Sequence, residues 1–489
     1  MDLVSALAVD AGVELVAQHE RVVARLFLPG ESTPGGDSRT EAVLRRVLGM
    51  RPDALAVEAR SIRERFVPRH IDLIETLNAN ARLVLPAGAP DLDDDTAVVV
   101  GAVFSSEFAV EGAALCNPST VAHPDQGDVG PGELRLLLSV RSIGEGHISS
   151  IQFCEAIVGP GPTWRFLPRE PRLAVADIGV AAWDRDHFER ALLHGGGSGE
   201  MVRAVVQMLP PTFSAAEFAV VVQDLRPPLL HQDGAREQIE SMRVIADSAY
   251  RAEFAPTSAV SARVLLPTAD EERRGMEDVR LVEVDGADGG DGPRYRGTYT
   301  AYDGRSIASR MITTDDFRSF EIHRLTGRPS LTKGMALFPR LIDGEWAALS
   351  RTDGESTGLT RSRDGVDWGR EEPVQRPNAL WEVVQTGNCG PPLETDEGWL
   401  VLTHGVGPMR SYSIGALLLD LDDPSQVIGM LDRPLIEPFG AIGGYVPNVA
   451  YSCGGIIHDG TLWIPHGVAD QSIRVASVDL ARLLSELVH

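Results

Sequence analysis

Short runs rich in valine, leucine, tyrosine and threonine alternate with turn residues along most of the chain beyond residue 95. The runs that indicate strands lie at 96–104, 133–140, 278–284, 295–302, 345–351, 398–406 and 415–421. Asp-Gly pairs, which are strong turn signals, stand at 285–286, 303–304, 343–344, 364–365 and 459–460. Many short strands at regular spacing predict a sandwich, a barrel or a propeller, and a propeller suits a span too long for one sandwich. We therefore expect an all-β domain over residues 91–489.

The first 90 residues follow a different pattern. Residues 21–29 indicate a short strand, and apolar positions with helical spacing then recur in stretches that begin near Ser38, Pro52 and Pro68. The segment 85–95, rich in proline and aspartate, indicates a linker. We therefore expect a mainly helical extension over residues 1–90. Helical spacing returns at three later places, 184–208, 233–250 and 479–487.

Composition and charge exclude several classes of protein. Of 489 residues, 43% are hydrophobic and 24% are charged, which is ordinary for a globular chain and excludes a disordered or collagen-like one. The 70 acidic and 45 basic residues give a net charge of −25, which repels phosphate backbones and anionic lipid, so nucleic acid and membrane are poor partners. There is no apolar run long enough for a transmembrane helix and no basic, apolar leader at the N-terminus. These features favour a cytoplasmic protein.

The cysteines and the common motifs of catalysis point away from metal and nucleotide chemistry. The four cysteines are widely scattered without a CxxC pair, at 116, 154, 389 and 453, and buried small side chains are their simplest interpretation. No HExxH, EF-hand loop or P-loop occurs, nor a GxGxxG after a strand. We therefore expect no metal and no cofactor.

Several polar, glycine-containing segments stand out from the strand pattern. They are EDVR (277–280), ALFPR (336–340), SR (350–351), GWLVLTHGV (398–406), ALLLDLDDP (416–424), GYVPNVAY (444–451) and HGVAD (466–470). In this order and spacing they resemble glycoside hydrolase family 130, the mannoside phosphorylases and related mannosidases, from about residue 100 to 475. The resemblance implies a five-bladed β-propeller with the active site in its axial funnel. GEGHISSI (144–151) and the helical extension are similar to the branch that acts on β-1,2-linked mannosides.

The resemblance assigns the general acid to Asp278 of EDVR. An inverting phosphorylase needs one carboxylic acid to protonate the leaving oxygen, against the two carboxyl groups of an inverting hydrolase, because phosphate is itself the nucleophile. In the family the proton is thought to pass through a hydroxyl of the bound mannose. Alternation along a strand places Arg280 on the same side as Asp278. The alternative is that these two residues form a structural ion pair or cap a turn.

Phosphate binding is implied for Arg340, Arg351, His404 and Gln385. Arginine suits this task because its planar guanidinium can bind two phosphate oxygens at once. Many phosphorylases of the family have lysine where this chain has Gln385, and a glutamine donates hydrogen bonds without bringing a charge. Lys333 could replace the lost charge.

Sugar binding is implied for a further set of residues, namely Asn117, Arg141, His147, Arg280, Tyr302, Asp303 and Asp470. Three of these have structural alternatives. Asp303 belongs to an Asp-Gly pair typical of hairpin turns, His147 could close a turn, and Asp470 ends a predicted strand.

Some positions depart from the family pattern. Cys154 stands where arginine is frequent in the long branch, Ala441 and Ile442 stand where glutamate is frequent, and His466 stands where tyrosine is common. Together with Gln385, these departures leave two alternatives to a phosphorylase open, a hydrolase and a propeller without catalysis.

The first expectation is an inverting phosphorylase that uses β-mannosides and inorganic phosphate and releases α-mannose 1-phosphate. The second is an inverting hydrolase on the same scaffold, with Glu145, Glu277 or Glu382 as the base. The third is a propeller that binds glycans without catalysis. The apolar faces of the helical extension also make a homo-oligomer plausible.

Overall fold

The computed structural model describes residues 7–30, 38–197, 199–231, 233–284, 294–438 and 443–487. The chain forms two compact units. The larger comprises Met1–Ala17, Ala113–Arg169 and Ala176–His489, and the smaller comprises Gln18–Gly112 and Glu170–Val175. This division differs from the predicted boundary at residue 90, because residues 1–17 belong to the larger unit and the smaller unit continues to Gly112. The strand β1 (Ala8–Val16) pairs with β30 (Ser472–Asp479), which lies near the other end of the sequence. No local sequence pattern predicts this pairing.

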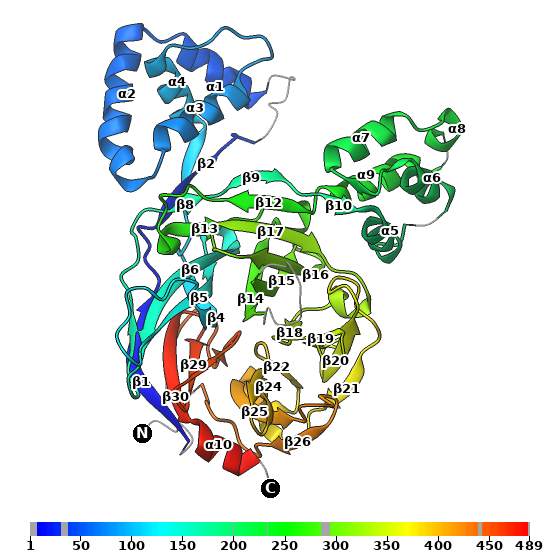
Figure 1. Ribbon diagram of the computed structural model, residues 1–489. Coiled ribbons are helices and arrows are strands. Elements are labelled where there is room, and N and C mark those ends of the chain that lie inside the picture. The colour runs from blue at the N-terminus through cyan, green and yellow to red at the C-terminus, as the bar shows by residue number, and fades with distance from the viewer. Residues whose placement is uncertain are drawn as a thin grey trace. The chain divides into compact units, whose positions relative to one another are not determined.

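The smaller unit is a group of helices with one antiparallel pair of strands (Figure 1). Its elements are β2 (Val22–Leu26), α1 (Arg39–Leu48), α2 (Pro52–Phe66), α3 (Leu73–Val84), α4 (Asp94–Val103) and β3 (Ser105–Ala109). The strand predicted at 21–29 and the three predicted helices are confirmed. Leu55, Ala59 and Leu77 belong to the buried core that these helices share.

The strand predicted at 96–104 was wrong, because this segment forms α4. Asp93 caps the helix, since its side chain accepts the backbone N–H of Thr96 at 3.0 Å. Gly101 allows α4 to lie against α3, because a Cβ there would come within 2.1 Å of the carbonyl oxygen of Leu77. Valine runs have the same hydrophobic pattern in a buried helix as in a buried strand, so periodicity could not separate the two.

The larger unit contains successive groups of mostly antiparallel strands (Figure 1), and the first two groups share one 12-stranded sheet through a parallel pair at Ser149 and Gly275. In chain order, the first group is β4 (Ala114–Ala122), β5 (Leu134–Ile143) and β6 (Ser149–Val158), and the second is β14 (Gly275–Glu283), β15 (Tyr295–Tyr302), β16 (Ile307–Thr314) and β17 (Ser319–Arg324). The third is β18 (Ala336–Leu337), β19 (Trp346–Ser350), β20 (Thr357–Ser362) and β21 (Glu372–Gln375), and the fourth is β22 (Gln385–Asn388), β23 (Leu393–Thr395), β24 (Gly398–Val406), β25 (Tyr412–Leu419) and β26 (Val427–Met430). The fifth is β27 (Ala450–Tyr451), β28 (Ile456–His458), β29 (Thr461–Val468) and β30, joined by β1. The β-rich architecture predicted from the strand pattern is confirmed.

Each group contacts the next one along the chain. The contacts join β4 to β14, β14 to β18, β19 to β22 and β25 to β27, and the last group returns to the first through β29 and β4. The five groups are therefore linked in sequence, and the last is linked to the first. At the predicted turns, Gly304, Gly344, Gly365 and Gly460 adopt positive φ of 99°, 79°, 76° and 70°, as tight turns require. The predicted turn at 285–286 lies outside the described residues.

A helical insertion separates β9 (Asp177–Val180) from β12 (Tyr250–Glu253). These two strands pair with each other, so the insertion leaves the sheet unbroken. Its elements are β10 (Trp183–Asp184), α5 (Arg185–His194), α6 (Glu200–Met208), β11 (Thr212–Phe213), α7 (Ala215–Gln223), α8 (Pro227–Leu230) and α9 (Ala235–Ala246). The helices predicted at 184–208 and 233–250 are confirmed, and α7 and α8 were not predicted.

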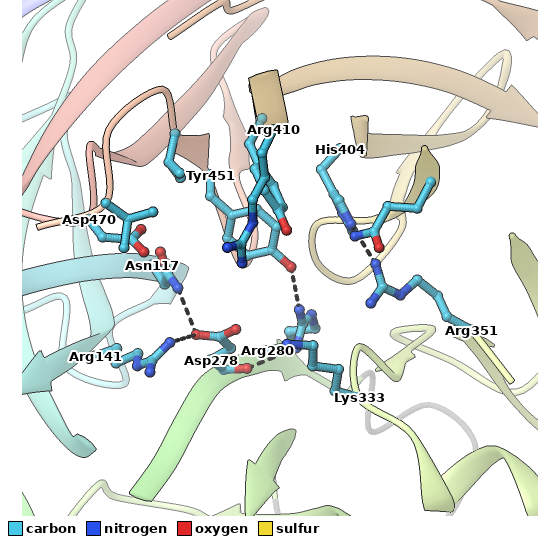
Figure 2. A pocket seen from close by; sticks show the side chains of 14 residues that line it. Asn117, Arg141, Asp278, Arg280, Lys333, Arg351, His404, Arg410, Tyr451 and Asp470 are labelled. Atoms are coloured by element: carbon cyan, nitrogen blue, oxygen red, sulfur yellow. Dashed lines mark hydrogen bonds and ion pairs between the residues drawn. The ribbon is translucent and has the colours of Figure 1, made fainter. Parts of the chain in front are cut away.

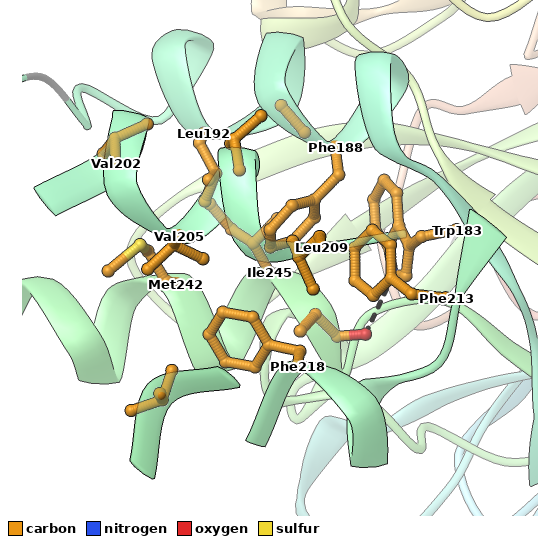
Figure 3. Close-up of a cluster of buried hydrophobic side chains, with 14 of the residues drawn as sticks. Trp183, Phe188, Leu192, Val202, Val205, Leu209, Phe213, Phe218, Met242 and Ile245 are labelled. Atoms are coloured by element: carbon orange, nitrogen blue, oxygen red, sulfur yellow. Dashed lines mark hydrogen bonds between the residues drawn. The ribbon is translucent and has the colours of Figure 1, made fainter. Parts of the chain in front are cut away.

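The insertion has a hydrophobic core of its own, built around aromatic rings (Figure 3). The ring of Phe188 lies 5.2 Å from Trp183, 5.0 Å from Phe213 and 5.6 Å from Phe218, in edge-to-face arrangements. The indole N–H of Trp183 donates to the carbonyl of Ala246 at 2.9 Å, so the one polar atom of this core side chain is satisfied. This core explains how a segment of short helices holds a defined structure.

The predicted C-terminal helix is confirmed as α10 (Leu480–Leu487). The remaining short strands of the larger unit are β7 (Trp164–Phe166) and β13 (Arg263–Leu265). Among the helices of the described residues, none has the length and apolar character that crossing a membrane requires.

Candidate active site

A polar cavity of about 170 Å³ lies where the inner strands of the larger unit meet (Figure 2). Its lining comes from every group of strands, and the residues are Asn117, Arg141, Asp278, Arg280, Lys333, Arg351, Gln385, His404, Arg410, Tyr412, Val446, Val449, Tyr451 and Asp470. Two carboxyl groups therefore face five lysine and arginine side chains in one small space.

Irregular backbone aims the polar side chains at this cavity. The ladder between β4 and β5 slips at Asn117, the ladder between β14 and β15 slips at Asp278, and these residues have φ of 50° and 57°. Asp470, just after β29, has φ of 47°. Left-handed conformations of non-glycine residues cost about 1–3 kcal/mol each and are typical of functional sites. The bulges, rather than simple strand alternation, bring Asp278 and Arg280 to the same cavity.

Asp278 is buried and held by three neighbours. Its carboxylate accepts a hydrogen bond from the Asn117 amide at 2.7 Å and lies 3.4 Å from the Arg141 guanidinium, while Arg280 donates to its backbone carbonyl at 3.0 Å. Burial alone would raise the pKa of Asp278, but Arg141, Arg280 and the Asn117 amide outweigh it and hold the pKa below its usual value. The carboxyl group is therefore ionised in the protein without substrates.

Arg141 and Arg280 are anchored by the protein itself. Arg141 donates to Glu277 at 2.7 Å and to the Ser149 hydroxyl at 2.9 Å. Arg280 donates to the carbonyl of Cys389 and to the Tyr451 hydroxyl, both at 2.8 Å. These contacts fix two positive charges beside Asp278 before any ligand arrives.

Arg351 and His404 form a second fixed pair. The Arg351 guanidinium donates to Nε2 of His404 at 2.6 Å, which requires a neutral imidazole with its proton on Nδ1. Burial lowers the pKa of His404 far below its usual value, and Arg351 and Arg280 lower it further. Nε of Arg351 is buried and has no hydrogen-bond partner within the described residues, so this donor remains available.

Gly387 on β22 makes this pair possible. A Cβ at this position would lie 2.3 Å from Cδ of Arg351 and 2.7 Å from Cε1 of His404. Real Cβ atoms do not approach other atoms so closely, so a larger residue would displace the arginine from the cavity. Gln385, two residues earlier, lines the cavity beside the pair.

Two buried acceptors remain open at the other side of the cavity. Oδ1 of Asn117 and Oδ1 of Asp470 have no hydrogen-bond partner within the described residues. Leaving such atoms unsatisfied is costly, and hydroxyl groups of a sugar are donors that could satisfy them. Burial raises the pKa of Asp470 to about 6, opposed by Arg141 and reinforced by the negative Asp278 and Glu277.

We expect Asp470→Asn to stabilise the protein at neutral pH and to lower activity. A raised pKa in the folded state means that folding favours the neutral carboxyl, so the free energy of unfolding falls as pH rises from about 4 to about 6. Asparagine stays neutral, so the variant should gain about 1–3 kcal/mol over the native chain at pH 7.5 compared with pH 4. Urea unfolding of both proteins at the two pH values measures this difference. A stability difference independent of pH would contradict the expectation.

The structure brings most of the predicted site residues together. Asn117, Arg141, Asp278, Arg280, Arg351, Gln385, His404 and Asp470 line the cavity, as does Lys333. Arg340, predicted to bind phosphate, does not. It follows the two-residue strand β18 and turns to the surface, where it pairs with Glu394 at 2.8 Å and covers the Trp399 ring at 4.8 Å. Its local motif gave no sign of this direction.

Three predicted sugar-binding residues also lie away from the cavity lining. Asp303 caps the turn after β15, since its carboxylate accepts the backbone N–H groups of Arg305 at 2.6 Å and Ser306 at 2.7 Å. Tyr302 ends that strand without reaching the cavity. His147 is exposed and packs on Tyr445 with ring centroids 5.6 Å apart.

The three glutamates considered as a hydrolytic base do not line the cavity either. Glu382 accepts from the Gln375 amide at 3.1 Å and the Asn378 backbone at 3.1 Å. Glu277 is paired with Arg141, and Glu145 is exposed.

The positions that depart from the family pattern have varied surroundings. Cys154 is buried in a hydrophobic cluster with Leu138 and Trp463. His466 is buried, and its Nδ1 lies 3.0 Å from the carbonyl oxygen of Ile464. Ala441 and Ile442 lie outside the described residues.

Sequence reasoning missed a set of lining residues: Arg410, Tyr412, Val446, Val449 and Tyr451. All lie within or beside the glycine-rich segments 403–410 and 444–455, so the segments were recognised while the directions of these side chains were not. Tyr451 packs edge-on against His404 at 5.0 Å and accepts from Arg280, which joins the two fixed pairs.

Comparison with known proteins agrees with this geometry. The model of glycoside hydrolase family 130, described as β-1,4-mannooligosaccharide phosphorylase, matches residues 236–488. A 1,2-β-oligomannan phosphorylase of Thermoanaerobacter sp. (strain X514) is 32% identical over 226 residues, which are 44% of this chain and 72% of that protein. A β-1,2-mannobiose phosphorylase of Listeria innocua is 30% identical over 46% of this chain and 63% of its own length.

A solved structure of β-1,2-mannobiose phosphorylase from Listeria innocua, in complex with β-1,2-mannobiose, is also similar. It has a TM-score of 0.44 and 20% identity over 78% of this chain and 93% of that chain. The family model covers more than half of this chain, including Asp278, the Arg351–His404 pair and Asp470. The chain therefore belongs to glycoside hydrolase family 130.

Proposed function

We propose that this protein is an inverting glycoside phosphorylase that cleaves β-mannosides, with β-1,2-linked manno-oligosaccharides as its substrates and α-mannose 1-phosphate as its product. The observation that carries the proposal is the division of one cavity into two ends. One end has a buried carboxyl group, Asp278, beside unsatisfied acceptors, and the other has Arg351, His404 and Lys333. The names of the relatives from Thermoanaerobacter and Listeria support the same activity.

We propose further that the larger unit is a five-bladed propeller, with the cavity at its axis. The strand groups that begin at β4, β14, β18, β22 and β27 would be the blades. Contacts between successive groups, and the return from β29 to β4, support a ring. Pairing of β1 with β30 would join the two ends of the chain within one blade.

In the proposed reaction, an oxygen of phosphate attacks the anomeric carbon of mannose from the face opposite the glycosidic oxygen. The bond to that oxygen breaks, and the proton of Asp278 reaches it, directly or through a sugar hydroxyl, so the β-linkage becomes an α-phosphate. Open acceptors on Asn117 and Asp470 would hold hydroxyls of this mannose. Cations fixed around the reacting groups would stabilise the negative charge that moves between the reactants.

Phosphate would also prepare the acid for its task. Asp278 is ionised without substrates because of nearby cations, among them Lys333. A phosphate dianion beside Lys333 and Arg351 would offset their field and raise the pKa of Asp278. Protonated acid would then accumulate when phosphate is bound, which is when the reaction needs it.

Hydrolysis is the second candidate, and Gln385 is the observation that favours it. An inverting hydrolase needs a second carboxylate to activate water. Among the described residues, Asp470 is the one other carboxyl group in the cavity lining, while Glu145, Glu277 and Glu382 are not part of it. The arrangement therefore supports phosphorolysis better. A glycan-binding propeller without catalysis is the remaining alternative.

The remaining parts of the proposal concern the co-substrate, the excluded partners and the location. Inorganic phosphate would be the co-substrate, with no cofactor. A body of net charge −25 disfavours nucleic acid and membrane surfaces but leaves a small anion free to enter, because the lining sets the field in a narrow cleft. We propose a cytoplasmic location, and a homo-oligomer stays a prediction.

The test is incubation of β-1,2-mannobiose with and without phosphate, followed by product analysis. Release of mannose 1-phosphate only in the presence of phosphate would support the proposal. Free mannose without phosphate would identify a hydrolase. Binding without any product would leave the glycan-binding alternative.

A further inference from the structure

One arginine of the cavity differs from the other arginines in how it is held. Arg410 follows Met409 in the turn between β24 and β25, and these two consecutive residues have φ of 55° and 57°. A pair of left-handed non-glycine residues is costly backbone, of a kind found at ligand-binding sites. Arg410 is exposed to solvent and also lines the cavity, where Figure 2 shows it beside Tyr451.

The remaining arginines of the cavity have partners within the protein. Arg141 is held by Glu277 and Ser149, Arg280 by Cys389 and Tyr451, and Arg351 by His404. Arg410 makes no hydrogen bond or ion pair within the described residues. Its charge acts on Asp470, whose ionised form it favours. The strained turn thus presents an arginine whose N–H donors have no partner within the described residues.

At the end of the cavity where phosphate would bind, the position of Gln385 contributes no charge. Gln385, beside Arg351 and His404, can donate a hydrogen bond but is neutral, and the imidazole of His404 is neutral as well. Asp470 adds a carboxylate that would repel a phosphate dianion. A flexible guanidinium between Asp470 and the arginine–histidine pair would weaken this repulsion and contribute a forked pair of donors.

We propose that Arg410 is a phosphate-specificity residue that supplies the positive charge missing at Gln385. It binds the phosphate co-substrate from the turn between β24 and β25, while Lys333 reaches the cavity from the segment before β18 (Figure 2). The inference rests on the proposed phosphorylase activity and names one further residue for it.

The test compares Arg410→Gln with the native chain in phosphorolysis of β-1,2-mannobiose. The KM for phosphate should rise about 10- to 100-fold, the range for loss of one charge-assisted, forked contact, while the KM for mannobiose changes less than about threefold. Arg410→Lys, which keeps the charge and loses the fork, should give an intermediate KM for phosphate. Adding Gln385→Lys to Arg410→Gln should restore most of the loss.

Arg340→Gln is the matched control. It changes net charge by the same amount at a surface ion pair outside the cavity, and the KM for phosphate should stay at the native value. A structural role of Arg410 would lower stability or kcat for all substrates without a selective change in the KM for phosphate. That result would overturn the inference, as would a rise confined to the KM for mannobiose.

The design separates this inference from the proposed function. If the native chain releases mannose without phosphate, the proposed phosphorylase activity fails, and the inference fails with it. If the native chain requires phosphate but Arg410→Gln and Arg410→Lys keep its KM, only the inference fails. If Arg410→Gln does not fold, Arg410→Lys provides the test, because it keeps the charge but loses the fork, and a native KM for phosphate in that variant would overturn the inference.

Discussion

Asp278→Asn is expected to lower turnover of β-1,2-mannobiose by about 10²–10⁴-fold, the contribution that a positioned general acid makes. The substitution keeps the size of the side chain, and its amide oxygen can still accept the hydrogen bond from Asn117. The buried neighbours Arg141 and Arg280 keep their other partners. Sugar binding should therefore survive while proton delivery to the leaving oxygen is lost.

Two measurements distinguish this outcome from general damage. Calorimetric titration with mannobiose should give a dissociation constant close to that of the native chain. A mannoside with a phenolic leaving group of low pKa needs little protonation, so the variant should recover much of its rate on that substrate. The matched control is Asp303→Asn, because Asp303 caps an exposed turn and its loss should leave turnover near the native value. Native-like turnover by Asp278→Asn would refute the assignment of the acid.

The residues that sequence patterns identified correctly are those whose position follows from local chemistry. Strand texture and Asp-Gly turns reflect side-chain branching and backbone freedom within a few residues, and they predicted β5, β14, β15, β19, β24 and β25 of the larger unit. Asp278, Arg351 and His404 lie in motifs whose inner strands end at the cavity, and they were placed together correctly.

Side-chain direction was the part that sequence could not provide. The β-bulges at Asn117 and Asp278, and the left-handed pair at Met409 and Arg410, depend on pairing with distant strands. The family resemblance therefore assigned Arg340 to phosphate binding although its side chain pairs with Glu394 at the surface, and Arg410 was not predicted to line the cavity. The same lack of long-range information explains why the valine run in α4 was interpreted as a strand and why β1 was assigned to the helical extension.

Replacing Arg351 should have the second-largest effect on catalysis. The side chain is 5% exposed, pairs with His404 at 2.6 Å and keeps Nε unpaired. Removing one partner of a buried, charged contact costs about 2–5 kcal/mol. We therefore expect Arg351→Ala to lower kcat/KM for phosphate by about 10²–10³-fold at a nearly unchanged affinity for mannobiose. Arg351→Lys should recover only part of this loss, because lysine lacks the planar fork.

Gly387→Ala provides a test that keeps the arginine. The added methyl group would lie 2.3 Å from Cδ of Arg351, so the guanidinium must leave its position while the net charge of the chain is unchanged. If the fixed position of Arg351 matters for phosphate, this variant should show the same selective rise in the KM for phosphate as Arg351→Ala. If total charge alone matters, Gly387→Ala should behave like the native chain. Initial rates at varied phosphate concentrations decide between these two outcomes. A native KM for phosphate in Gly387→Ala would show that electrostatic attraction, rather than a preorganised guanidinium, binds the co-substrate.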